Sequence, residues 1–174
     1  MDNVIEINEG GYTLLARYRA SADGFMRIDV FSDGARVYSE GKDEQGVWEW
    51  PGGAEEPENV SHDGVGALEH GLEFNLFELP ARGHQVELIG CETLYGNAYY
   101  VLNATLSDGF ENFRYVNAET WLVDLSRDFR AFHPAIDSTR KHLETHYDQW
   151  TTNDGVRSAR RTRNVDLETG EILA

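Results

Sequence analysis

The stretch KHLETHYDQW, residues 141–150, holds side chains that could bind a metal ion. In a β-strand, alternate side chains share a face, so His142, Glu144, His146 and Asp148 would point the same way. Two histidines with two carboxylates form a ligand set that zinc accepts. The stretch therefore indicates either a metal site, as in a metal-dependent hydrolase or a metal-binding protein, or the solvent-exposed face of a strand.

The spacing along a strand favours the exposed face. Side chains on one face of a strand lie about 6.6 to 7 Å apart, so two histidines hold one ion only if their rotamers converge and a second strand contributes. Leu143 and Tyr147 would form the apolar face of the same strand. We expect the histidines and carboxylates to lie on the solvent-exposed side of the strand, and we expect no metal.

Other catalytic signatures are missing from the sequence. GVGALEHG contains glycines but lacks the preceding strand and the lysine of a phosphate-binding loop, and no G-x-S-x-G turn occurs. Cys91 is the only cysteine, so the chain forms no internal disulfide and no cysteine-based metal cluster. We expect no cofactor and no enzymatic activity.

The charge of the chain argues against nucleic acid as a partner. Thirty-one acidic residues against fifteen basic ones give a formal net charge of -16, which repels phosphate backbones. The local exception is RSARRTR, residues 157–163, with four arginines in seven residues. This segment indicates a solvated strand or a contact with an anion.

Membrane insertion through a helix is also not expected. The sequence has no run of about 20 apolar residues, which is the length that a spanning helix needs. The first residues, MDNVIEINEGG, have neither a basic region nor an apolar region of an export signal. A mature form, a truncated reading frame and a cytoplasmic protein all fit this start, and the oligomeric state is left open.

The elements that would position these residues are mainly strands. Segments such as residues 12–20 and 25–31 alternate apolar and polar side chains, and Asp-Gly pairs at 33–34, 108–109 and 154–155 separate alternating runs. Residues 65–76 instead space their apolar side chains by three and four, which predicts a helix with Ser61 or Asp63 as N-cap. At 174 residues the chain fits one domain, 1–174.

The order of these elements resembles the outer-membrane lipoprotein-sorting protein family, the LolA/LolB-like half-barrel group. The resemblance covers nearly the whole chain and rests on strand and turn motifs. These motifs are Val86-Glu87-Leu88, Gly90, Glu92, Gly96, Tyr100, Leu102, Asp108-Gly109, Tyr115, Thr120, Leu122, Val123, Tyr147 with Asp154-Gly155, and Thr169-Gly170-Glu171.

The resemblance implies a fold and a function. The fold is a strongly curved, open antiparallel sheet of about ten strands, a half-barrel meander whose helical insertion covers the concave face. The function is the carriage of a lipid or of a lipoprotein acyl chain in the periplasm, without catalysis. A structural interaction domain with a filled core and no ligand is the alternative. The apolar groove between sheet and helix would be lined by Leu14, Met26, Ile28, Val30, Val37, Trp48, Leu68, Leu72 and Leu76.

Overall fold

The computed structural model describes residues 2–9, 11–21, 25–59, 79–133, 137–153 and 155–174. These residues are mainly β, and every strand pair among them is antiparallel, which confirms the predicted class. The helix predicted over residues 65–76 lies outside the described residues. None of the described residues forms a helix with the length and apolar character that crossing a bilayer requires.

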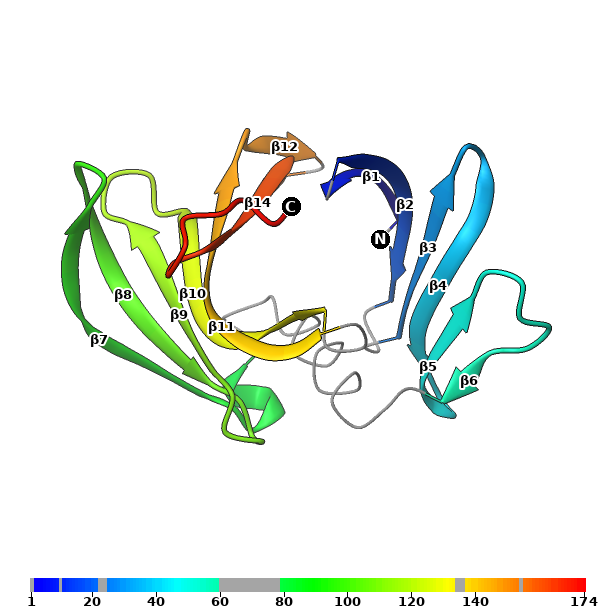
Figure 1. The fold of residues 1–174 in the computed structure, drawn as a ribbon. Helices are drawn as coiled ribbons and strands as arrows, with labels where there is room; N and C mark the ends of the chain where they lie inside the picture. The colour runs from blue at the N-terminus through cyan, green and yellow to red at the C-terminus, as the bar shows by residue number, and fades with distance from the viewer. Residues whose placement is uncertain (1, 10, 22–24, 60–78, 134–136, 154) are drawn as a thin grey trace. The chain divides into compact units, whose positions relative to one another are not determined.

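The strands do not form the single sheet of about ten strands that the sequence suggested. They form two six-stranded sheets and a two-stranded hairpin within the described residues, and the two large sheets belong to two compact units (Figure 1). A twisted meander of this length splits more readily than it extends. The single domain over residues 1–174 stays a prediction.

The N-terminal unit is a simple meander in which each strand pairs with the next one in the sequence. Asp33 and Gly34 join β3 to β4 with φ angles of 50° and 80°, which is the two-residue turn that Asp-Gly predicts. The strands are β1 (Asp2–Glu9), β2 (Tyr12–Ala20), β3 (Met26–Ser32), β4 (Ala35–Asp43), β5 (Gly46–Pro51) and β6 (Glu58–Asn59).

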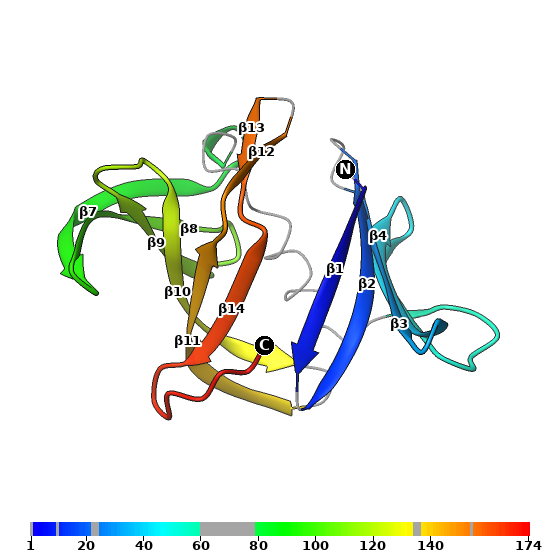
Figure 2. The same ribbon diagram turned by 90° about the horizontal axis from the view of Figure 1, so that it is seen from above.

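The C-terminal unit holds the second large sheet, in the order β14-β11-β10-β9-β8-β7. The hairpin β12–β13 extends from β11 and β14 (Figure 2), so the strand pair predicted around Asp154-Gly155 is interrupted rather than continuous. The elements are η1 (Pro80–Arg82), β7 (Gln85–Leu94), β8 (Asn97–Thr105), β9 (Glu111–Asn117), β10 (Val123–His133), β11 (Asp137–Asp148), β12 (Thr151–Asn153), β13 (Val156–Ser158) and β14 (Arg161–Asp166).

Two small apolar clusters hold this second sheet together. One consists of Tyr99, Val101, Tyr115 and Leu125, which are at most 5% exposed. The other places Leu79, which precedes η1, against Ala104 and Leu106. The first cluster lies on the face of the sheet that carries the polar site described below.

The sheet of the C-terminal unit is strongly curled. Tyr95 lies in the turn between β7 and β8, yet its hydroxyl donates a hydrogen bond of 2.8 Å to Glu144 on β11. Strands β8, β9 and β10 lie between β7 and β11 in the sheet order. The turn therefore folds over the face that the clustered aromatic side chains share, and that face is concave.

The two edges of this sheet differ. Beyond β14, the C-terminal residues turn back and pair with it, through hydrogen bonds of 2.7 Å from Asn164 N to Ala174 O and 2.9 Å from Asp166 N to Glu171 O. At the other edge, the pairing of β7 with β8 shifts between Leu88 and Gly90, so Ile89 is an extra residue that forms a β-bulge. Gly90 adopts a φ of 155° there.

Candidate functional site

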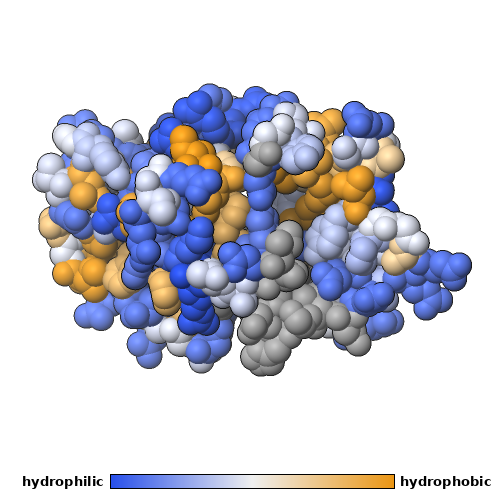
Figure 3. All heavy atoms as spheres, viewed as in Figure 1, coloured by the Kyte–Doolittle hydropathy of each residue, from blue (hydrophilic) through white to orange (hydrophobic). Residues whose placement is uncertain are grey.

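Four of the predicted groove residues share one face of the N-terminal sheet. In the pairing of β2 with β3, Ala16 lies opposite Val30, Tyr18 opposite Ile28, and Ala20 opposite Met26. Leu14 precedes Ala16 by two residues and so lies on the same face. Ala16 and Met26 are 1% and 7% exposed, and Figure 3 shows hydrophobic side chains gathered over β1 to β3.

Strand β1 extends this apolar face. Ile7 lies opposite Leu14, and Ile5 lies opposite Ala16. The sequence analysis did not assign these two isoleucines to the groove, although they alternate with Glu6 and Asn8 as the residues of a strand do. We call the set Ile5, Ile7, Leu14, Ala16, Met26, Ile28 and Val30 the apolar face.

The other predicted groove residues lie elsewhere. Val37 is the extra residue where the β3–β4 pairing shifts, because Val30 pairs with Tyr38 and Phe31 pairs with Arg36, and Val37 is 40% exposed. Trp48 lies opposite Gly41, which pairs with Arg27, so its ring is on the side of the sheet opposite the apolar face. Leu68, Leu72 and Leu76 lie outside the described residues.

The reverse side of the N-terminal sheet is charged and aromatic. The carboxylate of Asp29, 4% exposed, accepts hydrogen bonds from Arg19, from Arg27 at 2.8 Å and from Ser39 at 2.7 Å. Burial raises the pKa of Asp29, but the hydrogen bonds from these three side chains outweigh it and lower the pKa to about 2. Asp29 is therefore a carboxylate at neutral pH, and it orders the arginines around it.

The two tryptophans of β5 stack against arginines on this reverse side. The guanidinium carbon of Arg27 lies 5.6 Å from the ring centroid of Trp48, and that of Arg36 lies 4.2 Å from the ring of Trp50. Both distances are within the range of cation–π attraction. Trp48 thus has a structural partner on the charged side and does not contribute to the apolar face.

The stretch around Glu144 is not the exposed face that the sequence suggested. Glu144 is 1% exposed, and its neighbour Leu143 on the other face of β11 is also 1% exposed. Both faces of β11 are therefore covered at its centre. Alternation along a single strand could not show this, because the side chains that cover Glu144 come from β10 and from the β7–β8 turn.

Glu144 is the centre of a hydrogen-bonded cluster. Its Oε1 accepts hydrogen bonds from Tyr95 at 2.8 Å and lies 2.6 Å from Nε2 of His146. Its Oε2 accepts a hydrogen bond of 2.8 Å from Nε of Arg127. The Arg127 guanidinium in turn lies over the ring of Tyr115, with 5.1 Å between its carbon and the ring centroid.

These contacts decide the charge of the cluster. Burial raises the pKa of Glu144, but the hydrogen bonds from Tyr95 and Arg127 and the charge of Arg127 lower it below its usual range. The hydrogen bond to Glu144 raises the pKa of Tyr95 in return. The cluster therefore contains a buried carboxylate paired with a guanidinium, a combination that holds the sheet in its curled form.

The metal-binding alternative finds no ligand set here. His142 packs against Phe129, with ring centroids 4.6 Å apart, and Asp148 gives both carboxylate oxygens to Arg161 at 2.7 Å. Among the described residues, no group of three or more His, Cys, Asp or Glu side chains is placed to hold a metal ion. The alternating side chains of residues 142–148 are divided among separate partners.

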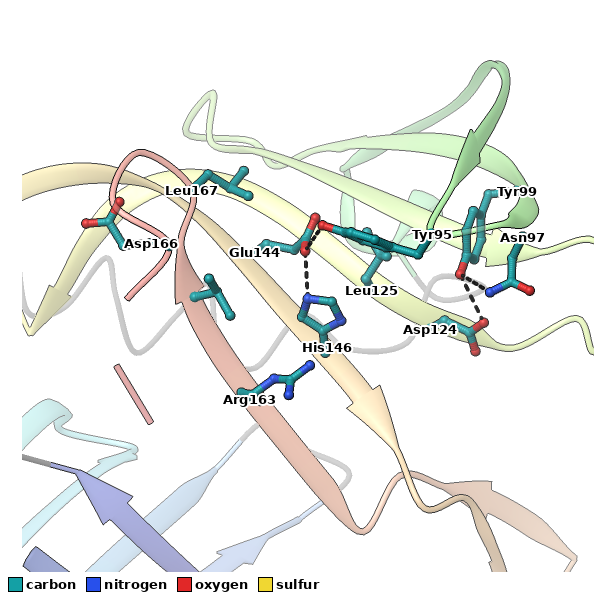
Figure 4. Close-up of a pocket in the computed structure, with 12 residues that line it drawn as sticks. Tyr95, Asn97, Tyr99, Asp124, Leu125, Glu144, His146, Arg163, Asp166 and Leu167 are labelled. Atoms are coloured by element: carbon teal, nitrogen blue, oxygen red, sulfur yellow. Dashed lines mark hydrogen bonds and ion pairs between the residues drawn. The ribbon is translucent and has the colours of Figure 1, made fainter. Parts of the chain in front are cut away.

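A pocket of about 570 Å³ adjoins this cluster, and we call it the Glu144 pocket (Figure 4). Its walls come from the β7–β8 turn, β8, β10, β11, β14 and the segment after β14, all within the C-terminal unit. Figure 4 shows Tyr95 and His146 on either side of the Glu144 carboxylate and Arg163 next to His146. Its lining consists of Tyr95, Asn97, Tyr99, Asp124, Leu125, Glu144, His146, Arg163, Val165, Asp166, Leu167 and Gly170.

The sequence analysis did not identify this pocket, and the reasons are local. Tyr95 adopts a φ of 51° in a Tyr-Gly turn, a conformation that is uncommon for an aromatic residue and has no sequence signal. Asp124 is the extra residue where the pairing of β10 with β9 shifts between Val123 and Leu125. In the sequence, only the arginine-rich segment 157–163, which includes Arg163, pointed to a part of this pocket.

Comparisons with known proteins establish the fold. No protein-family profile matches the sequence, and no curated protein matches it. Several solved structures are similar, and the three described here each align over almost the whole chain. A DUF1329 family protein from Desulfovibrio piger is 17% identical with a TM-score of 0.62, and the alignment covers 97% of this chain and 78% of that one.

The other two structures carry related descriptions. A LolA superfamily protein from Nitrosomonas europaea is 13% identical with a TM-score of 0.62, over 97% of this chain and 78% of that one. A proposed outer membrane lipoprotein-sorting protein domain from Vibrio parahaemolyticus is 11% identical with a TM-score of 0.66, over 96% and 77%. The chain shares the fold of these structures, as the sequence resemblance predicted.

Proposed function

We propose that this chain, which has the fold of lipoprotein-sorting and LolA-superfamily proteins, binds a lipid or a lipoprotein acyl chain and carries it without catalysis. The observation that carries the proposal is the apolar face of the N-terminal sheet, where strands β1, β2 and β3 bring aliphatic side chains together on one side. A solved structure of this fold is described as an outer membrane lipoprotein-sorting domain. The compartment that goes with this proposal is the periplasm.

The chemistry of the apolar face suits an acyl chain. Its members are aliphatic, and Leu14, Ile28 and Val30 are neither fully buried nor fully exposed. Each methylene that a ligand buries against such a surface contributes about 0.8 kcal/mol. An acyl chain of ordinary length would therefore gain enough free energy here to bind without any fixed polar contact.

The charged side of the same sheet suits the carrier role in a different way. Asp29, three of the arginines and two tryptophans occupy the side opposite to the apolar face. The sheet therefore has one side that is apolar over β1 to β3, with Glu40 opposite Ile28 at its border on β4, and one side that is charged. In this proposal Leu68, Leu72 and Leu76, predicted to be helical, cover the bound chain.

Adjacent leucines on β2 provide the test. Leu14 lies on the apolar face, whereas Leu15 pairs with Phe31 on the charged side and is 50% exposed. We expect Leu14→Glu to weaken the binding of a fluorescent fatty acid at least about tenfold, which corresponds to 1.4 kcal/mol. Leu15→Glu is the matched control and should bind as the wild type does.

Two further measurements complete the experiment. Leu14→Ser is a milder variant, and circular dichroism shows whether each variant keeps its strands. Native mass spectrometry of the wild-type protein from its source should reveal co-purified lipid. If the wild type contains no lipid and takes up neither fatty acid nor lipopeptide, or if the two glutamate variants bind equally, the carrier proposal is wrong.

A further inference from the structure

Two charged side chains of the Glu144 pocket form no salt bridge among the described residues. Of the pocket's acids, Glu144 is paired with Arg127 at 2.8 Å, and Asp166 is paired with Lys141 at 3.2 Å. Asp124 and Arg163 remain, one negative and one positive, and both line the pocket. A ligand with complementary charges would neutralise both.

Arg163 has an unmet hydrogen-bond donor. Its Nε is shielded from water and has no hydrogen-bond partner among the described residues. Asp148, which could have served it from β11, already gives both oxygens to Arg161. A buried donor without a partner costs about 1–3 kcal/mol. The guanidinium that carries this donor also lines the pocket, where its charge is available to a ligand.

Asp124 has only neutral partners. Its Oδ2 accepts hydrogen bonds from Nδ2 of Asn117 at 2.7 Å and from the hydroxyl of Tyr99 at 3.5 Å. Figure 4 shows it beside Tyr99 and Asn97 at the other end of the pocket from Arg163. Neutral donors hold the carboxylate in place and leave its charge uncompensated, which favours an ammonium group in the pocket.

The sheet register sets the separation between the two charges. Arg163 lies opposite His146, and His146 lies opposite Leu125, the residue after Asp124. Adjacent strands are about 4.8 Å apart, so two strand spacings separate the backbones by about 10 Å. The two side chains start from either end of this span, and His146 lies on the strand between them. A ligand that meets both charges would therefore lie over His146, which also lines the pocket.

We propose that the Glu144 pocket binds a small zwitterion of the amino-acid class, with its carboxylate at Arg163 and its ammonium group at Asp124. Leu125, Val165 and Leu167 supply apolar walls for the side chain of such a ligand. The volume of about 570 Å³ falls within the usual range of small-molecule sites. This site lies wholly in the C-terminal unit and shares no residue with the apolar face.

Leucine and two singly charged analogues test the proposal on the wild-type chain. Hexanoate carries only the carboxylate, and hexylamine carries only the ammonium group. In an NMR titration of the backbone amides, we expect leucine to shift signals of β10, β11 and β14. Its dissociation constant should be at least about tenfold lower than that of either analogue, because it satisfies both charges.

Three variants assign the contacts. Arg163→Gln and Asp124→Asn should each weaken leucine binding at least about tenfold, the equivalent of losing one charged contact. Arg160→Gln is the matched control, because Arg160 is an exposed arginine three residues before Arg163 and does not line the pocket. Leu14→Glu should leave leucine binding unchanged, which separates this site from lipid carriage.

Several results would overturn the proposal. The proposal is wrong if leucine at tens of millimolar shifts none of the backbone amide signals of the pocket residues. Hexanoate could bind as tightly as leucine, which would make this a simple carboxylate site. Arg160→Gln could weaken binding as much as Arg163→Gln does, which would show a general effect of losing a positive charge.

Discussion

The hydroxyl of Tyr95 donates a hydrogen bond of 2.8 Å to Oε1 of Glu144, although the two residues are 49 positions apart in the sequence. One lies in a turn at an edge of the sheet and the other near the opposite edge. The bond exists only because the sheet curls over its own face. It therefore reports on the curvature of the C-terminal unit.

Removal of this hydroxyl should destabilise the fold. We expect Tyr95→Phe to lower the free energy of unfolding by about 1 kcal/mol, the net contribution of one hydrogen bond at a partly exposed site. Urea denaturation gives this quantity. Tyr12→Phe, at a tyrosine that is 75% exposed, is the control and should unfold as the wild type does. Equal effects of the two substitutions would show that the bond does not support the curl.

The Asp29 cluster predicts a dependence of stability on acid. The folded-state pKa of Asp29 is about 2 and its ordinary value is 3.8, so between these values the unfolded chain binds more protons. The stabilisation from Asp29 is therefore complete above about pH 4 and is lost as the pH falls toward 2, with a size on the order of 2 kcal/mol.

The measurement compares the wild type with Asp29→Asn. The free energy of unfolding, measured with urea at pH values from 2 to 6, should fall less in acid for the variant than for the wild type. The variant lacks the contribution of Asp29, whereas its other carboxylates still bind protons. Parallel pH profiles for the two proteins would mean that the arginines do not hold Asp29 ionised in the folded state.

Zinc should not bind to residues 142–148. The oxygens of Glu144 already accept hydrogen bonds from Tyr95 and Arg127, and those of Asp148 are held by Arg161. A metal would have to displace these donors. In equilibrium dialysis we expect the wild type and the double variant His142→Ala/His146→Ala to take up equal amounts of zinc. One equivalent that only the wild type retains would restore the metal-site interpretation.

The sequence contained enough information for the class of fold and for several of its turns. Period-two alternation predicted β2 and β3, and Asp-Gly predicted the turns at 33–34 and 108–109, both of which lie between paired strands. These features depend on neighbouring residues alone, through strand alternation and the positive φ that glycine permits.

Features that depend on distant residues were not predictable in this way. Alternation placed Glu144 among exposed side chains, because it cannot show that Tyr95 and Arg127 converge on it from other elements. Trp48 was expected in the groove for a similar reason, since only its pairing with Gly41 shows which face of the sheet it occupies. The β-bulges at Val37 and Asp124 also shift the alternation of side chains between the two faces, and no feature of the sequence predicts them.

The edges of the C-terminal sheet have a consequence for self-association. A straight edge strand offers its free N–H and C=O groups to a second molecule, which is a common route to aggregation. Here the last residues of the chain, Glu171 to Ala174, already occupy hydrogen-bonding positions along β14. The bulge at Ile89 disrupts the regular spacing along β7. Residues 171–174 therefore cover one edge of this sheet, and an irregular backbone interrupts the other. Deletion of residues 171–174 should expose β14 and promote fibre formation.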